Sequence, residues 1–295
     1  MFHAHVFTRE FGVDVKMSVE LPEASILAGQ LDKELPGKRI SACDLRDYER
    51  MQKIGFMNKD LRDYDRVVDG VVESAVSRGN TILVKLDNGM NMVITPEYGG
   101  VVLYHVSSES LPSKYHLKVD FDDGTALTVR LTSMGVISAV DDSGLPDSYV
   151  YRRDFSEKAS PKGPGFTFER FTELVSDRRR QLKQVLVGKD AVLVGLSNSA
   201  FQDVIYRAGL HPRRRASELS DDERRALFDA INQLIGERLR LGGKDKFQDI
   251  YGRQGHYAPA MGPNMKERDC PACGTPIEKI NHGGGQVYLC PRCQK

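Results

Sequence analysis

Four of the five cysteines lie in the last 26 residues of the 295-residue chain, in two Cys-x-x-Cys pairs. The first pair is Cys270 and Cys273, the second is Cys290 and Cys293, and sixteen residues separate them. Two pairs at this separation are typical of a β-hairpin that binds one zinc ion tetrahedrally through four thiolates. All four coordination positions are taken, so we predict a structural zinc ion that supplies the folding energy of this segment.

Glu20 stands just before a predicted helix, at a position where a side chain can cap the helix N-terminus. Apolar residues at helical spacing from Pro22 to Leu35, followed by Pro36-Gly37, predict that helix.

The elements that position these residues fall into two blocks. In the first, alternating stretches surround Asp87-Asn88-Gly89 and Asp122-Asp123-Gly124, which predicts two β-hairpins in a sandwich of short strands. The Pro- and Gly-rich stretch 156–166 reads as a linker. In the second block, helical spacing predicts three helices, over 168–187, 198–208 and 217–236, with a capping box at Ser220 and Glu223.

These patterns predict an α+β multidomain protein. We expect an N-terminal extension over 1–18, a β-rich domain over 19–153, a linker over 154–166, a helical domain over 167–258 and a zinc finger over 259–295.

Composition and charge narrow the class of protein. No apolar run reaches the ~18 residues that cross a membrane, and the first residues, MFHAHVFTRE, do not form a signal peptide, so we expect a cytoplasmic protein. Residues 1–150 hold 16 Lys and Arg against 23 Asp and Glu, whereas residues 151–295 hold 26 against 18. A basic second half favours an anionic partner, most simply nucleic acid. Taken alone, however, runs such as Arg178-Arg179-Arg180 are better interpreted as solvated helix faces.

Three segments together resemble the formamidopyrimidine-DNA glycosylase and endonuclease VIII family of base-excision repair enzymes. Glu20-Leu21-Pro22-Glu23 is similar to the family's N-terminal motif, residues 195–212 to its helix–two-turn–helix signature, and the CPACGTPIEKI and CPRCQ segments to its zinc finger. The resemblance implies an N-terminal β-sandwich-like domain, a helical helix–two-turn–helix domain and a C-terminal four-cysteine zinc-finger hairpin, in that order.

The resemblance also implies a chemistry. Family members extrude a damaged base, and the amine of an N-terminal proline attacks the sugar C1′ to form a Schiff base, after which the strand is cleaved by elimination. On this basis Glu20 and Glu23 are the expected catalytic residues. The implied partner is duplex DNA with a lesion or distortion, bound by a monomer. The expected DNA-binding residues are Asn198, Lys183, Arg213 and Gln286, with a helix cap and a solvated turn as alternatives at Asn198 and Arg213.

Four positions depart from the family pattern. Val19 stands where the proline belongs, and the residues before it make its nitrogen an amide without a lone pair for attack. Asn80 replaces the lysine that follows Arg-Gly, Gly285 replaces the arginine of the zinc hairpin, and Thr132-Ser133-Met134-Gly135 replaces the paired-arginine segment. Cleavage before Val19 would restore an amine.

These departures favour a DNA-binding protein that recognises damaged or distorted DNA without the lyase chemistry. One alternative is an active DNA glycosylase/AP lyase, either processed at Val19 or hydrolytic with Glu20 or Glu23 activating water. The other is an RNA- or protein-binding module on the same scaffold. Met92, Tyr98 and Met134 are either wedges for unstacked DNA or hydrophobic strand positions.

Overall fold

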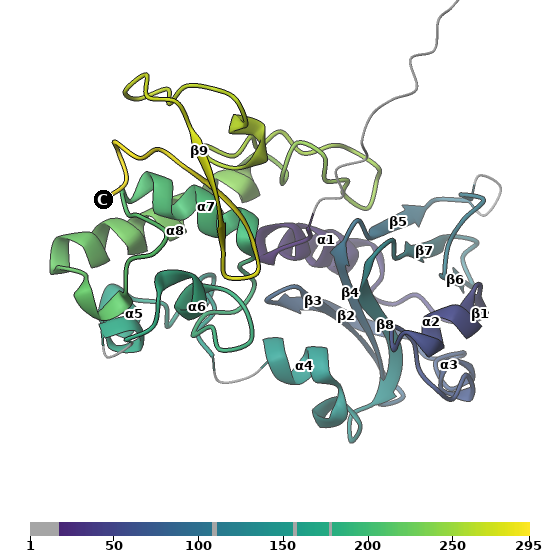
Figure 1. Cartoon of the computed structure of the whole chain (residues 1–295). Helices are drawn as coiled ribbons and strands as arrows, with labels where there is room; N and C mark the ends of the chain where they lie inside the picture. The colour runs from purple at the N-terminus through teal and green to yellow at the C-terminus, as the bar shows by residue number, and fades with distance from the viewer. Residues whose placement is uncertain (1–17, 108–110, 156–157, 177–178) are drawn as a thin grey trace, which may run out of the picture.

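The computed structural model describes residues 18–107, 111–155, 158–176 and 179–295, so the predicted extension lies outside the described residues except for Ser18. Figure 1 shows a β-rich half and a helical half, with helix α1 (Leu21–Glu34) where they meet and the C-terminal hairpin lying along the helical half. Within the described ranges, no helix combines the length and apolarity needed to cross a membrane.

The β-rich half is a sandwich of two antiparallel four-stranded sheets. One sheet has the order β2 (Val72–Arg78), β3 (Thr81–Leu86), β4 (Met90–Tyr98), β8 (Met134–Asp141). The other has the order β1 (Ile40–Leu45), β6 (Leu117–Phe121), β7 (Ala126–Arg130), β5 (Val101–His105). Both hairpins predicted from the sequence are present, as β3–β4 and β6–β7.

The sandwich core forms because alternate residues of each strand point inward. Val84 and Ile94 from one sheet and Val119 from the other are buried in one cluster, which α1 completes with Leu27 and Leu31. The short helices α2 (Tyr48–Lys53), α3 (Arg62–Asp65) and α4 (Tyr149–Asp154) flank the strands.

The helical half contains α5 (Phe168–Ser176), α6 (Leu182–Leu186), α7 (Asn198–Arg207) and α8 (Asp221–Arg240). The prediction of one helix over 168–187 is wrong, because residues 179–181 are not helical. Gln181 has extended backbone angles and caps α6, and its neighbours pair with the 214–216 segment: Leu182 N donates to Arg214 O at 2.9 Å. That pairing competes with helical hydrogen bonds and ends the helix.

Helix α8 begins at Asp221, later than the predicted start at 217, and the predicted capping box is present. Ser220 Oγ accepts a hydrogen bond from Glu223 N at 3.2 Å, and Glu223 Oε2 accepts one from Ser220 N at 2.8 Å, which completes the capping box. The helix continues beyond the predicted end at Gly236 to Arg240. Its apolar face packs with α5, α6 and α7 in a second hydrophobic core.

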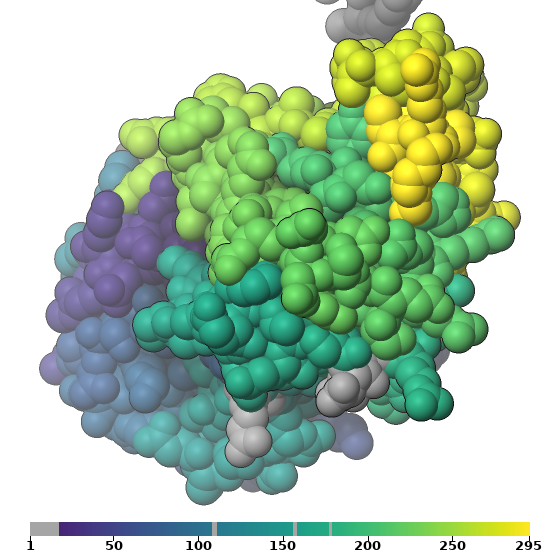
Figure 2. Space-filling model, turned by 90° about the vertical axis from the view of Figure 1, so that its left-hand side faces the viewer, coloured from purple at the N-terminus to yellow at the C-terminus, as the bar shows by residue number. Residues whose placement is uncertain are grey.

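The C-terminal hairpin pairs β9 (Glu278–His282) with β10 (Gly285–Leu289). It packs on α7, where Tyr288 N donates to Gln202 Oε1 at 2.8 Å and the side chain of Val287 enters the second core. Figure 2 shows these C-terminal residues projecting at one edge of the helical side. The hairpin therefore extends the surface of the helical half.

Candidate functional site and zinc centre

The four predicted metal ligands, Cys270, Cys273, Cys290 and Cys293, come together at the base of the hairpin. Their sulfur atoms all lie within 4.8 Å of one another. The sulfurs of Cys270 and Cys293 are 3.9 Å apart, and those of Cys273 and Cys290 are 3.5 Å apart. Tetrahedral Zn–S bonds of about 2.3 Å require sulfur separations of about 3.8 Å. The donor set fits one closed, structural zinc ion.

Val19 lies inside the molecule at the junction of the two halves. Its backbone N–H donates to Glu97 O at 2.9 Å, and its side chain is buried. The preceding residue is also held, since Ser18 forms a β-bridge with Tyr98 and its Oγ lies 3.3 Å from Ser197 Oγ. The position of the family's N-terminal amine is thus a hydrogen-bonded internal amide, with the chain continuing on both sides.

Glu20 follows directly and is fully buried. Its Oε1 accepts from Ser197 N at 2.7 Å and from Ala200 N at 3.4 Å, both at the N-terminus of α7. Its Oε2 accepts from Ser199 Oγ at 3.1 Å and from two cations described next. Glu20 is also the N-cap residue of α1, so its backbone occupies the predicted capping position. Its carboxylate, however, also bonds to the start of α7 and to the two cations.

Four fully buried charged residues, Glu20, Glu23, Arg238 and Lys244, form what we call the buried charge cluster. Lys244 Nζ lies 3.0 Å from Glu20 Oε2, and Arg238 Nη1 donates to the same oxygen. Glu23 Oε2 lies 3.7 Å from Arg238 Nη1 and 3.9 Å from Lys244 Nζ, and it accepts from Glu20 N at 3.1 Å. Two anions and two cations therefore balance one another between the two halves.

Electrostatics keeps Glu20 ionised. Burial alone would raise the pKa of this carboxyl, but the charges of Lys244 and Arg238 and the hydrogen bond from Ser197 outweigh burial and hold the pKa far below its ordinary value. Lys244 Nζ also donates to the Ser18 carbonyl and lies 3.1 Å from Ser18 Oγ. The cluster therefore also holds the segment that leads into Val19.

The sequence analysis did not identify Arg238 or Lys244 as site residues. The position of Arg238 in its helix could nevertheless have indicated that it is buried. Leu227, Ile231 and Leu234 form the buried stripe of α8, and Arg238 continues the same stripe four residues further on. A charge on an apolar stripe predicts a buried partner of opposite sign. Lys244 lies in a loop after α8 and has no comparable periodic signal.

Three of the predicted DNA-binding residues meet at the hairpin tip. Lys183 Nζ donates to His282 O at 2.6 Å, and Asn198 Nδ2 donates to Gln286 O at 3.0 Å. The side chain of Lys183 is buried, and burial lowers its pKa, whereas Gln286 is exposed. At Gly283, whose φ is +53°, a Cβ would lie 2.9 Å from Lys183 Cδ, so glycine lets the tip sit this close.

The remaining candidates lie elsewhere. Arg213 is exposed on the turn after α7, and its N–H donates to His211 Nδ1 at 3.2 Å. Tyr98 and Met134 are opposite each other in the β4–β8 pair and are 44% and 54% exposed, which leaves them available as wedges. Met92 is buried in the sandwich core, so the hydrophobic-strand interpretation holds for it.

Comparison with known proteins matches three segments in order. The formamidopyrimidine-DNA glycosylase N-terminal domain matches residues 19–132, the H2TH domain of the same glycosylase residues 159–248, and the zinc finger found in FPG and IleRS residues 270–295. A formamidopyrimidine-DNA glycosylase of Roseiflexus sp. (strain RS-1) is 28% identical over 281 residues, covering 94% of this chain and 99% of that protein. One from Listeria innocua is 26% identical over 280 residues, with 94% and 99% covered.

Solved structures show the same fold. The complex between Lactococcus lactis Fpg and DNA containing an abasic site superposes with a TM-score of 0.79 at 20% identity, covering 94% of this chain and 99% of that one. The Lactococcus lactis complex with DNA containing FAPY-dG gives 0.77 at 19% identity, with 94% and 100% covered. With three matched segments in the family's order and a zinc centre of the matching donor set, this chain belongs to the formamidopyrimidine-DNA glycosylase and endonuclease VIII family.

Proposed function

We propose that this protein binds DNA carrying a lesion or a distortion and that the chain, with residues preceding Val19, does not perform the amine-dependent lyase reaction. The related proteins are named as DNA glycosylases, and the Lactococcus lactis structures hold damaged DNA. The observation that carries the second part is the Val19 amide, which donates its hydrogen to Glu97 O. An amide nitrogen delocalised into a peptide bond is not a nucleophile.

The hydrolytic alternative is disfavoured by the surroundings of Glu20. A general base must accept a proton from water, and it works best with a pKa near the working pH. Both oxygens of Glu20 already accept hydrogen bonds, and the paired cations lower its pKa. Glu23 is enclosed in the same cluster.

DNA binding is supported by donors near the start of α7. Asn198 and Lys183 each hold more N–H donors than their contacts to hairpin carbonyls use. Arg213 and Gln286 are exposed. We propose these four side chains as phosphate and sugar contacts that fix the register of the duplex without reading bases. We also propose that the domains have the boundaries predicted from the sequence.

The test pairs a binding measurement with a trapping measurement. Fluorescence anisotropy compares a short duplex containing a stable abasic analogue with the same duplex undamaged, and borohydride trapping uses a natural abasic site. We expect tighter binding of the damaged duplex, a binding constant that falls steeply with salt, and no trapped band. The matched control is a chain of residues 19–295, produced by cleavage so that it begins with the amine of Val19.

A trapped band from the full chain would show that it forms a Schiff base, and the proposal that it lacks lyase chemistry would be wrong. A trapped band from residues 19–295 alone would show that processing converts the binding protein into a lyase. If neither chain binds either duplex, the DNA proposal falls and an RNA or protein partner takes its place.

A further inference from the structure

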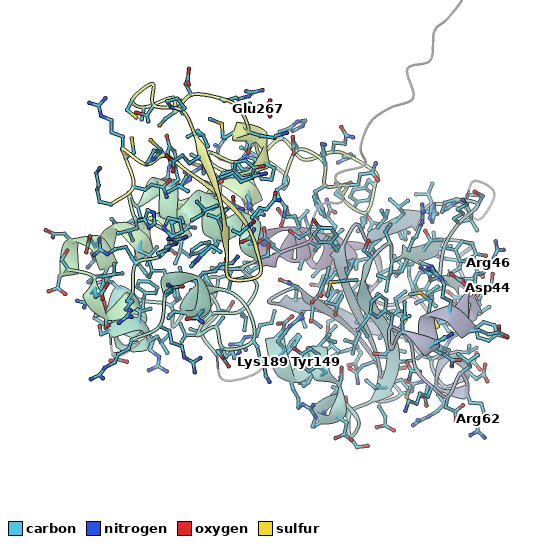
Figure 3. The ribbon with its side chains drawn as sticks, viewed as in Figure 1. Asp44, Arg46, Arg62, Tyr149, Lys189 and Glu267 are labelled. Atoms are coloured by element: carbon cyan, nitrogen blue, oxygen red, sulfur yellow. The ribbon has the colours of Figure 1, made fainter. Side chains whose placement is uncertain are left out.

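A pocket of about 320 Å³ opens at one end of the β-rich half, where the corner between β1 and α2 meets the segment before β6 and the end of β7. Figure 3 shows Asp44 and Arg46, which mark this corner, at the end of the β-rich half that lies away from the helical half. The pocket is therefore separate from the buried charge cluster and from the zinc centre. Four cationic side chains and one carboxylate line it: Arg46, Arg50, Lys114, Arg130 and Asp47.

This excess of positive charge stands in an acidic part of the chain. Residues 1–150 hold 23 acidic against 16 basic residues, yet the pocket gathers four cations around one carboxylate. The ion pairs at the pocket involve Arg46 and Arg50, and none among the described residues involves Lys114 or Arg130. Cations that share a hollow repel one another and attract an anion.

His116 adds a hydrogen-bond donor that has no acceptor. The residue is only 7% exposed, and its Nδ1 accepts from Leu131 N at 2.9 Å, so the neutral ring carries its hydrogen on Nε2. Asp47 Oδ2 is 3.8 Å from Nε2, beyond hydrogen-bond distance, and no other described residue accepts from this nitrogen. Burial lowers the pKa of His116 despite the charge of Asp47. Near pH 7 the ring is therefore a buried, neutral donor at the pocket wall.

Two arginines are positioned with donors to spare. Arg46 lies over the ring of Tyr115, with 4.2 Å between its Cζ and the ring centroid, and its Nε is 3.4 Å from Asp44 Oδ2. The Tyr115 hydroxyl donates to the same oxygen of Asp44 at 2.5 Å, which fixes the ring. Arg50 uses its Nε in the same way, donating to Asp47 Oδ2 at 2.6 Å. Within the described part of the chain, the Nη groups of both arginines remain available for a ligand.

We propose that this pocket binds a phosphate group carried by a small molecule, a function independent of the proposed DNA binding. The excess of cations suits an anion with two or more charges. A phosphate presents oxygens in tetrahedral directions, so it can accept at the same time from guanidinium groups, from Lys114 Nζ and from His116 Nε2. A carboxylate has two oxygens and would leave several of these donors unused. The volume falls in the range of small-molecule sites and leaves room for more than the phosphate itself.

A phosphate of the DNA backbone has the same chemistry and is the competing source. The position of the pocket favours the small molecule, because the corner marked by Arg46 lies on the far side of the β-rich half from the proposed DNA contacts at α7 and the hairpin (Figure 3). The experiment must therefore separate a free phosphorylated molecule from duplex DNA.

The test is isothermal titration calorimetry of the full chain with inorganic phosphate and with pyrophosphate, at low salt in a buffer without phosphate. We expect both to bind, and pyrophosphate more tightly because it carries more charge. Arg130→Gln and Lys114→Gln each remove an exposed cation and should weaken pyrophosphate binding about tenfold, as expected for loss of one charge-assisted contact. Lys59→Gln removes an exposed lysine outside the pocket and should bind like wild type.

The outcomes separate the two sources of phosphate. If wild type binds neither anion, or if the two pocket variants behave like Lys59→Gln, the proposal is wrong. The anisotropy measurement with the duplexes is then repeated with Arg130→Gln. Unchanged duplex binding together with weakened pyrophosphate binding would support a separate small-molecule site. Weakened duplex binding in a chain whose wild type binds neither small anion would show that the pocket contacts the DNA backbone instead.

Discussion

Two clusters of four polar side chains hold this molecule together, and they are built in opposite ways. The zinc ligands Cys270, Cys273, Cys290 and Cys293 lie within one hairpin and share one metal ion. The buried charge cluster joins Glu20 and Glu23 of α1 to Arg238 and Lys244, which are more than 200 residues away in the chain, with sequence separations such as 218 and 224. The first cluster folds a segment, whereas the second fixes two halves to each other.

Under the proposed function, the difference shows what the two glutamates do when no free amine precedes them. The zinc finger keeps the family's ligands, because loss of one thiolate would leave the hairpin without its folding energy. At the other cluster the family's glutamates remain, but they neutralise Arg238 and Lys244 and hold Ser18 and Val19 in place. The same carboxylates can therefore serve structure where the amine is absent.

Removal of zinc should have the largest effect. Structural zinc contributes about 10–16 kcal/mol in isolated zinc-finger peptides, so Cys290→Ser should release the metal and unfold the segment beyond residue 270. Zinc content by mass spectrometry under native conditions and proteolysis at the hairpin would measure this. Cys43→Ser should retain one zinc ion, because Cys43 lies in β1, far along the chain from the finger. Equal zinc content in both variants would show that the four thiolates do not form the site.

Breaking the buried charge cluster should have the next largest effect. Glu20→Ala leaves two buried cations facing one carboxylate, and removal of one partner of a buried ion pair typically costs about 3–5 kcal/mol. Urea unfolding of the full chain would measure the free energy of unfolding. Glu73→Ala removes an exposed carboxylate from β2 and should change stability by less than about 0.5 kcal/mol. A similar small loss in both variants would mean that the cluster contributes no stability.

The two clusters also differ in how far the sequence reveals them. The spacing of the cysteines is local, so the zinc centre and the hairpin follow from the sequence alone. The β-hairpins and the cap of α8 follow for the same reason, because turns and caps are set by neighbours. The partners of Glu20 do not follow, since no local pattern places Lys244 beside it. The break before α6 was missed because it depends on pairing with residues 214–216.

The pH dependence of stability separates the clusters further. The pKa of Glu20 is lowered in the folded protein, so its ionised form stabilises the fold above the ordinary value of 4.5, and this contribution is lost as the pH falls below 4.5. Glu20→Gln cannot titrate at this position. The stability difference between wild type and Glu20→Gln should therefore be constant from pH 7 to about 5 and shrink on further acidification. Urea unfolding across this range would measure it, and a difference that grows in acid would contradict the assignment.

The smallest effect is expected where the zinc hairpin touches the helical half. Lys183→Met removes the hydrogen bond to His282 O but keeps the buried stem, so we expect a loss of about 1 kcal/mol in the free energy of unfolding. Lys279→Met, an exposed change on β9, is the matched control and should be neutral. If Lys183 also contacts a phosphate, the plot of log binding constant against log salt concentration should become less steep by about one unit in Lys183→Met, and should not change in Lys279→Met. Equal slopes in the two variants would show that Lys183 only stabilises the hairpin and does not contact DNA. Asn198, Arg213 and Gln286 would then remain as the proposed DNA contacts.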